Sequence, residues 1–158
     1  MATSPSANSE VAEFAGQLFF WLWRASHTRI AEALESIGLT PALFGLLNVL
    51  GAREGAIQQE LGLAMGIDRS TMVLLVDGLE AKSLAKRRPH PADRRAREVA
   101  ITPKGRRVVQ QGRQMALQVE DEVLRGLTSG ERRQLLKLLR HAVSAAPPQP
   151  PWRADEGD

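Results

Sequence analysis

The chain has 158 residues, 43% of them hydrophobic, which is enough for one domain with a packed core. It contains no cysteine, so disulfides and thiolate chemistry are excluded, and its three histidines lie too far apart in sequence to indicate a metal site. No apolar run approaches the roughly 18 residues that a membrane span needs, and the N-terminus does not resemble a secretion signal. We therefore expect a cytoplasmic protein that needs neither cofactor nor metal and makes no membrane contact.

The positive charge is concentrated in one segment. The net charge is only +3, yet Lys82–Arg107 contains ten Lys or Arg residues and two acidic ones, while the rest of the chain has an excess of five negative charges. This asymmetry is typical of a basic surface for a polyanion on an acidic body. A solvated charged face is the alternative, and the elements around the segment must decide between the two.

The predicted elements begin after a short N-terminal segment, residues 1–9, that is predicted to be disordered, as is the Pro-rich tail, residues 146–158. A first helix is predicted over Glu10–Ile37, with apolar residues on two sides, as in a helix buried between two layers. Gly38 is a suitable stop. Thr40 and Pro41 then predict the N-cap and first residue of a second helix that ends at Gly51.

Two further helices follow in quick succession. The third is predicted over Ala56–Met65 and is ended by Gly66. Asp68 is a good N-cap for the fourth, predicted over Arg69–Lys82. A helical wheel of the fourth helix separates an inward set (Met72, Leu75, Val76, Leu79) from an outward set (Ser70, Val73, Leu74, Asp77).

The pattern then changes to short strands. Leu84–Arg88 and Glu98–Ile101 predict a β-hairpin, with turn residues such as Pro91 and Asp93 between them and basic residues at its tip. Beyond it, Thr102-Pro103 opens a long helix that reaches about Leu124, and a Thr128–Glu131 capping box opens the last helix. The predicted fold is mainly α with a small β-hairpin: a winged helix-turn-helix with further helices on both sides.

The order helix, tight break, helix and basic hairpin is a compact way to present one helix to the major groove of DNA. Arg69, Ser70 and Thr71 can bond bases or phosphates, and apolar Val73 and Leu74 can contact thymine methyl groups. The alternative is that Val73 and Leu74 fill a protein contact.

The hairpin favours DNA, because so many arginines on one small projection repel one another unless an anion is the usual neighbour. Asp93 can orient Arg95 for the minor groove, or the pair can simply close the turn, and both roles can hold together. The DNA-binding segment is therefore predicted to be Ile67–Thr102. Its predicted contact residues are Arg69, Ser70, Thr71, Val73, Leu74, Lys86, Arg87, Arg88, Asp93, Arg94, Arg95 and Arg97.

Several motifs along this segment resemble one known family in both order and spacing. They are Gly38-Leu39-Thr40, Glu60-Leu61, Ile67-Asp68-Arg69-Ser70-Thr71, Val76-Asp77-Gly78-Leu79-Glu80, Asp93-Arg94-Arg95 and Ile101-Thr102-Pro103-Lys104-Gly105. Together they resemble the MarR family of regulators, most strongly over Gly38–Arg107 and more loosely over Glu10–Ser144.

The resemblance implies a homodimer in which residues 10–37 and 103–145 form a dimerisation layer and residues 38–102 form the DNA-binding lobe. It also implies a repressor of pseudo-palindromic operators that a small aromatic or phenolic ligand releases. Val73 and Leu74 depart from the family, which often has a polar residue and an arginine at these positions, and Gly78 replaces another frequent arginine. These departures put the target sequence in doubt.

A ligand site is suggested by Trp21, Trp23, Arg24 and His27 on the first helix and Phe44 on the second, which can line a pocket for an aromatic acid. The alternative is that these residues are core or dimer contacts. An enzyme is not predicted, because the chain has no glycine-rich phosphate loop, no nucleophile–base pair and no metal cluster. The remaining alternative function is a winged-helix module for protein–protein interaction without a ligand response.

Overall fold

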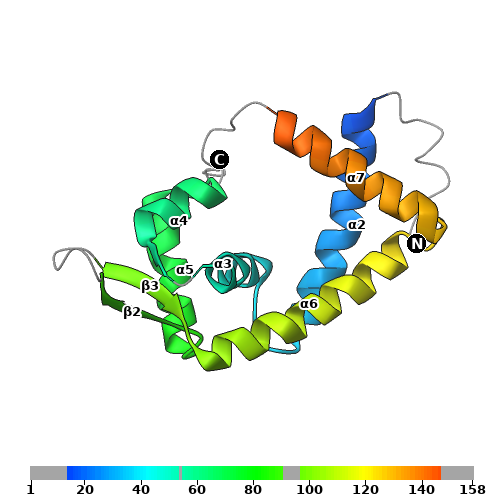
Figure 1. Cartoon of the computed structure of the whole chain (residues 1–158). Helices are drawn as coiled ribbons and strands as arrows, with labels where there is room; N and C mark the ends of the chain where they lie inside the picture. The colour runs from blue at the N-terminus through cyan, green and yellow to red at the C-terminus, as the bar shows by residue number, and fades with distance from the viewer. Residues whose placement is uncertain (1–13, 54, 91–96, 147–158) are drawn as a thin grey trace, which may run out of the picture.

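The computed structural model describes residues 14–53, 55–90 and 97–146. The lobe on the left of Figure 1 contains α3, α4, α5 and the sheet, and α6 runs from it as a long arm toward α7, with α2 packed along that arm. The elements in chain order are α2 (Ala15–Glu35), α3 (Pro41–Gly51), β1 (Ala56–Ile57), α4 (Gln58–Met65), α5 (Arg69–Ala81), β2 (Ala85–Pro89), β3 (Arg97–Ile101), α6 (Pro103–Val123) and α7 (Ser129–Ala145).

Four helices begin at the caps that the sequence predicts. In each, the side chain before the first helical residue accepts a hydrogen bond from a backbone N–H three residues further on, which satisfies one of the free donors of the first turn. The caps are Thr40 for α3, Asp68 for α5, Thr102 for α6 and Thr128 for α7. Thr128 forms a complete capping box with Glu131.

Three helices end in a residue with positive φ: Gly38 at +69°, Gly66 at +64° and Ser83 at +59°. After α5, the Ser83 N–H donates to the Glu80 carbonyl at 2.8 Å, and the Leu84 N–H donates to the Leu79 carbonyl at 2.9 Å. This pair of bonds is the Schellman pattern, which turns the chain sharply out of a helix. The predicted stops at Gly38 and Gly66 are therefore present, and Ser83 is a third stop that has a side chain.

The sheet has three antiparallel strands in the order β1-β3-β2, so the prediction of a two-stranded hairpin was incomplete. The predicted start of the third helix at Ala56 was wrong, because Ala56 pairs with Val99 and Ile57 pairs with Glu98. Helix α4 begins only at Gln58. Two residues are too few to show an alternating pattern, and their strand conformation is imposed by the pairing with β3.

The core lies inside the lobe and is completed by Leu34 of α2 and Val109 of α6, and the inward set of α5 faces it as predicted. Met72, Val76 and Leu79 are buried, and Leu75 is partly buried against the same cluster. The fully buried side chains come from α2, α3, α4, α5 and β3: Leu34, Leu46, Leu47, Leu50, Leu61, Met72, Val76, Leu79 and Val99.

Helix α6 approaches the lobe closely at one point. A Cβ added at Gly112 would lie 2.3 Å from Cε2 of Phe44, so the Phe44 ring occupies the space that a side chain would need. Phe44 is itself buried in the core cluster. A residue with a side chain at position 112 would push the arm away from α3.

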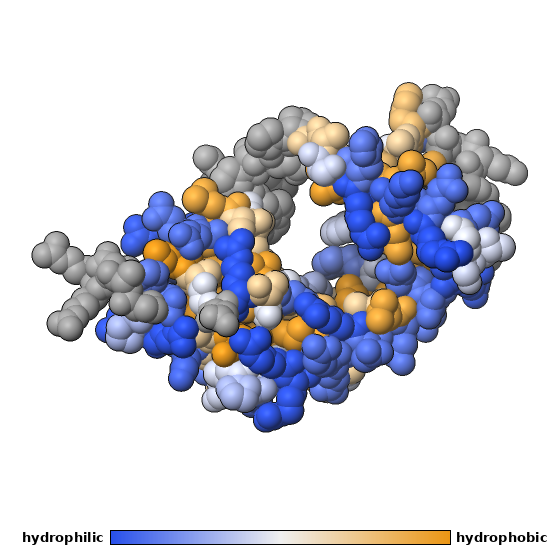
Figure 2. All heavy atoms as spheres, viewed as in Figure 1, coloured by the Kyte–Doolittle hydropathy of each residue, from blue (hydrophilic) through white to orange (hydrophobic). Residues whose placement is uncertain are grey.

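The end of the molecule that holds α2 and α7 is apolar and exposed within this chain. Phe14, Phe19, Trp23 and Val143 are between 52% and 75% exposed, and no described residue of α7 is buried. Figure 2 shows hydrophobic side chains at the surface of this end, and an open space between it and the lobe. Within the described ranges, no helix has the length and apolar character that a membrane span requires.

Candidate nucleic-acid interface

Helix α5 is the predicted recognition helix, and its first turn is organised by Asp68. The Asp68 carboxylate accepts hydrogen bonds from the Ser70 hydroxyl, from the Thr71 hydroxyl at 2.6 Å and from the Thr71 N–H at 3.0 Å. These bonds, the Ser70 hydroxyl first, lower the pKa of Asp68 well below its ordinary value. Both hydroxyl protons are therefore directed at the cap, and the two oxygens are left as acceptors.

The outer face of α5 is apolar after this first turn. Leu74 is 70% exposed and Val73 is 36% exposed, on the side opposite the buried Met72 and Val76. Asp77, the next outward residue, lies 2.6 Å from the Arg87 guanidinium. Arg69 is the exposed cation of the helix and has no carboxylate partner among the described residues. The face thus combines one cation with two apolar side chains.

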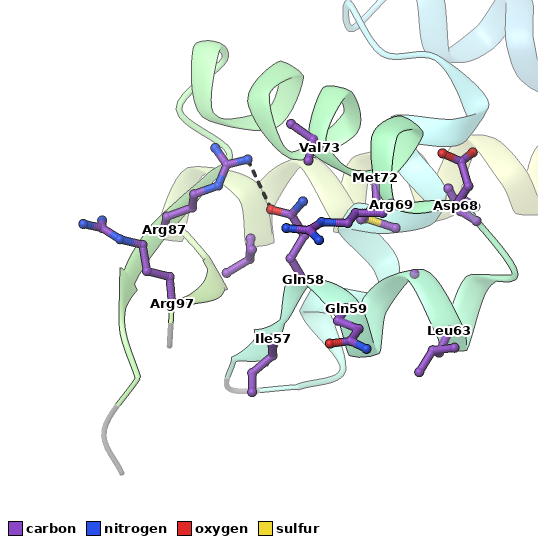
Figure 3. A pocket seen from close by; sticks show the side chains of 13 residues that line it. Ile57, Gln58, Gln59, Leu63, Asp68, Arg69, Met72, Val73, Arg87 and Arg97 are labelled. Atoms are coloured by element: carbon purple, nitrogen blue, oxygen red, sulfur yellow. Dashed lines mark hydrogen bonds between the residues drawn. The ribbon is translucent and has the colours of Figure 1, made fainter. Parts of the chain in front are cut away.

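A pocket of about 690 Å³ lies between α4, α5 and the sheet. Figure 3 shows Arg69 and Val73 on the side of α5 that faces Arg87, with Gln58 of α4 between them and Arg97 projecting outward from β3. The pocket wall mixes cations, amides and apolar side chains, as a surface for a polyanion with apolar groups requires. Its lining residues are Ile57, Gln58, Gln59, Gly62, Leu63, Ile67, Asp68, Arg69, Met72, Val73, Arg87, Arg97 and Val99.

Arg87 connects three elements across one side of this pocket. From β2, its guanidinium forms ion pairs with Asp77 and Glu80 of α5 and donates to the Gln58 side chain of α4 at 3.3 Å. Burial alone would lower the pKa of Arg87, but the hydrogen bonds to Asp77 and Glu80 outweigh it and raise the pKa. The charge of this predicted DNA contact is therefore balanced within the protein.

Arg88 is also paired. It forms an ion pair with Glu98 of β3, whose carboxylate is buried with a residue exposure of 5%. A Cβ at Gly55 would lie 2.6 Å from Glu98 Oε2, so a side chain at position 55 would require the Glu98 carboxylate to move. Sequence reasoning missed Glu98 as a structural residue of the wing. An acid directly after an arginine, at the start of a predicted strand, was the only sequence signal.

The remaining basic residues of the wing divide into two groups. Lys86 and Arg97 are exposed, and neither has a carboxylate partner in the part of the chain that the structure describes. Asp93, Arg94 and Arg95, which the sequence predicts at the wing tip, lie outside the described residues. Among the described strand residues, Lys86 and Arg97 are thus the cations whose charge is not balanced by a neighbouring acid.

The start of α6 is fixed against the end of α5. The Lys104 ammonium donates to the Lys82 carbonyl at 2.8 Å, and the Thr102 hydroxyl lies 2.9 Å from the Ser83 carbonyl. A Cβ at Gly105 would lie 2.1 Å from the Leu84 carbonyl oxygen. The Thr102–Gly105 motif therefore connects the arm to the turn between α5 and the wing.

The aromatic residues predicted for a ligand site form contacts along α2. Trp23 and His27 have ring centroids 4.9 Å apart, and Arg24 lies 5.8 Å from the centre of the Trp21 ring. The ring of Phe20 lies near both tryptophans. Phe44 does not share these contacts along α2, because its ring is buried in the core against Gly112. None of these residues lines the pocket between α4, α5 and the sheet.

Comparisons with known proteins agree with this geometry. Residues 37–96 match the model of the MarR family. The chain is 34% identical over 143 residues to the transcriptional regulatory protein proposed for the hcr operon of Thauera aromatica, covering 85% of this chain and 86% of that protein. The chain belongs to the MarR family. It is a transcriptional regulator with a winged helix, and its relatives are regulators and not enzymes.

Two solved structures of transcription-related or ligand-bound proteins are similar over most of the chain. BpsR of Bordetella bronchiseptica, whose DNA binding is regulated by 6-hydroxynicotinic acid, is 28% identical, with a TM-score of 0.73 and coverage of 85% of this chain and 96% of that one. CouR of Rhodococcus jostii, solved with p-coumaroyl-CoA, is 25% identical, with a TM-score of 0.72 and coverage of 85% and 94%. The predicted fold class and family are confirmed.

Proposed function

We propose that this MarR-family regulator acts as a homodimeric repressor on pseudo-palindromic operator DNA. The observation that carries the proposal is the outer face of α5, with exposed Arg69, Val73 and Leu74, beside a wing whose Lys86 and Arg97 have no balancing acid among the described residues. Phosphate neutralisation by these cations supplies affinity, and the α5 face supplies specificity. The Asp93–Arg95 pair at the wing tip belongs to the same proposal.

Dimerisation through α2, α6 and α7 is supported by the exposed apolar side chains at that end of the chain. Contiguous apolar surface on a single chain marks an interaction site, and a twofold dimer places two α5 helices on successive major grooves. Light scattering on the purified chain should give the mass of a dimer. A monomer that still binds operator DNA with full affinity would contradict this part of the proposal.

The DNA-binding role of the wing is tested with duplexes enriched from a random library by binding to the full chain. Arg95→Ala should weaken binding at least tenfold in an anisotropy titration, since an arginine inserted into a groove contributes about 1–3 kcal/mol. Arg53→Ala, the same charge change at an exposed residue after α3 and outside the proposed DNA contacts and dimer helices, is the matched control and should leave the affinity within about twofold. Equal losses in the two variants would contradict a specific role for the wing.

The same titration separates a DNA contact from an apolar protein contact. Binding through phosphates must weaken steeply as KCl is raised, whereas a module for protein–protein interaction would enrich no duplex and show no such slope. A promoter fused to a reporter then distinguishes repression from activation. Repression predicts higher expression when the chain is absent.

An aromatic effector is supported by the Trp21–Arg24 and Trp23–His27 contacts on α2 and by the aromatic compounds named for BpsR and CouR. Rings can stack on the tryptophans while Arg24 meets an anionic group. Benzoate, 6-hydroxynicotinate and p-coumaroyl-CoA are suitable probes. An effector should raise the melting temperature of the wild type and release DNA, and Arg24→Ala should lose both responses. No response to any of the three would count against these ligand classes.

A further inference from the structure

The outer face of α5 has few groups left to form hydrogen bonds with bases. The protons of the Ser70 and Thr71 hydroxyls are donated to Asp68, and the Asp77 carboxylate is paired with Arg87. Hydrogen-bond readout in the major groove relies on donors and acceptors that are free to meet base edges. After Arg69 and the Ser70 and Thr71 oxygens, which are left as acceptors only, the outward positions of α5 that remain available are Val73 and Leu74.

The large exposed apolar side chains among the described residues of the lobe lie on α4 and α5. Among the described residues of the lobe, the large hydrophobic side chains counted as exposed are Leu63 at 73%, Val73 at 36% and Leu74 at 70%. Two of them are adjacent on α5, and Leu63 and Val73 line the same pocket. The cations Arg69 and Arg97 line that pocket as well, so Val73 lies beside two cations, and Leu74 is the next residue of the same helix.

We infer that Val73 and Leu74 read thymine 5-methyl groups in each operator half-site. The inference rests on the proposed DNA-binding role of α5. The major groove offers phosphates on both edges and, at each A·T pair, one apolar methyl group. This combination matches a helix face that pairs flanking cations with two apolar side chains. A protein partner with an apolar face would gain nothing from the surrounding arginines.

The test removes the methyl groups and leaves the base-pairing groups unchanged. The enriched duplex pool is copied with either dTTP or dUTP, and the affinity of the full chain for each copy is measured by anisotropy at one KCl concentration. Burial of one methyl group changes affinity about three- to fourfold, so loss of one contact per half-site should weaken binding about tenfold in a dimer. Single dT→dU substitutions in one selected duplex then locate the contacted positions.

Variants show whether the discrimination comes from α5. The double variant Val73→Ala/Leu74→Ala should bind the two copies with equal affinity, because its methyl-contacting groups are gone. Arg69→Ala removes a neighbouring exposed cation of the same helix, so it should weaken binding to both copies and keep the full preference for the dTTP copy. Because all three side chains are exposed, the variants should keep the wild-type circular dichroism spectrum and melting temperature.

Two failures are distinguishable. If the wild type binds both copies equally, with salt dependence intact, methyl readout is wrong and the proposed function stands. The same conclusion follows if the double variant keeps the wild-type preference, because the preference would then reflect the shape of the DNA. If no duplex is enriched and no salt-dependent binding is seen, the proposed function itself fails, and the inference fails with it.

Discussion

The guanidinium of Arg87 lies 2.6 Å from the carboxylate of Asp77, so an arginine of the wing is fixed to the helix that the wing flanks. Glu80 and Gln58 complete the contacts of the same guanidinium. One side chain of β2 therefore connects α5 and α4. Arg97, on the neighbouring strand, has no carboxylate partner among the described residues and leaves its charge for an external anion.

The first prediction separates these two arginines. Arg87→Gln should lower the free energy of unfolding by about 1–2 kcal/mol, because two carboxylates lose their shared partner in a partly exposed setting. Arg97→Gln should change it by less than about 0.5 kcal/mol, but should reduce the salt slope of DNA binding by about one per protomer. Urea unfolding at a fixed protein concentration and anisotropy titrations in KCl measure the two effects. Equal destabilisation by both substitutions would contradict the structural role of Arg87 and the free charge of Arg97.

The second prediction concerns two glycines inside helices. Gly112→Ala should destabilise the protein by about 1–3 kcal/mol, because its Cβ would overlap the Phe44 ring. Gly45→Ala, whose Cβ would meet only Met65 Cε at an ordinary 3.6 Å, should stabilise it by up to about 1 kcal/mol through helix propensity. Thermal melts of the two variants should move in opposite directions. A stabilising Gly112→Ala would show that α6 does not approach α3 this closely.

The third prediction follows from the left-handed backbone of Ser83. A φ of +59° is unfavourable for a residue that has a Cβ. The Ser83 side chain is exposed, so its removal leaves no cavity. Ser83→Gly should therefore stabilise the chain by about 1 kcal/mol. Ser129→Gly, at the first residue of α7 where no positive φ is needed, should not stabilise it. The urea midpoints of unfolding of both variants are compared with that of the wild type. A lower midpoint for Ser83→Gly would show that the backbone of Ser83 is not strained.

The fourth prediction is a dependence of stability on pH. The pKa of Asp68 is lowered by hydrogen bonds from Ser70 and Thr71, and the pKa of Glu131 is lowered by the backbone and side chain of Thr128. A carboxyl group whose pKa is depressed in the folded state contributes stability above its unfolded pKa, about 4, and loses it as the pH falls toward the folded pKa. Between about pH 5 and 7 both groups are ionised in the folded and in the unfolded state, so the free energy of unfolding should not depend on them there. Below about pH 4 it should fall.

A variant assigns part of this acid sensitivity. Asp68→Asn keeps an acceptor oxygen at the N-cap but does not titrate. Its free energy of unfolding should fall less steeply below pH 4 than that of the wild type. An identical acid profile for the two proteins would show that Asp68 does not contribute.

The parts of the fold that could be predicted are those coded by neighbouring residues. Thr40, Asp68, Thr102 and Thr128 begin helices through bonds that reach only three residues ahead, so the sequence itself contains both partners. The division of α5 into a buried and an exposed face follows from the helical period. The strand Ala56–Ile57 could not be predicted, because its partner in β3 is more than forty residues away.

The sequence predicts which basic residues the candidate site contains, but not which of them form ion pairs. The sequence shows an excess of arginines in the wing, and the structure divides them into those balanced by acids and those that are not. Arg87 and Glu80 are seven residues apart and meet only because β2 folds back along α5. Arg88 and Glu98 meet because the register of β2 and β3 places them opposite each other. Neither pairing has a local sequence signal.

The close contact of Gly112 with Phe44 makes α6 a lever with a defined pivot. A helix of 21 residues is a stiff rod about 30 Å long. A tilt of about 12° about Gly112, near the middle of this rod, therefore moves each end by about 3 Å, close to the rise of one base pair in B-DNA, about 3.4 Å. A displacement of the Phe44 ring that tilts α6 would thus be converted, at the ends of the arm, into a shift of about one base-pair step along operator DNA.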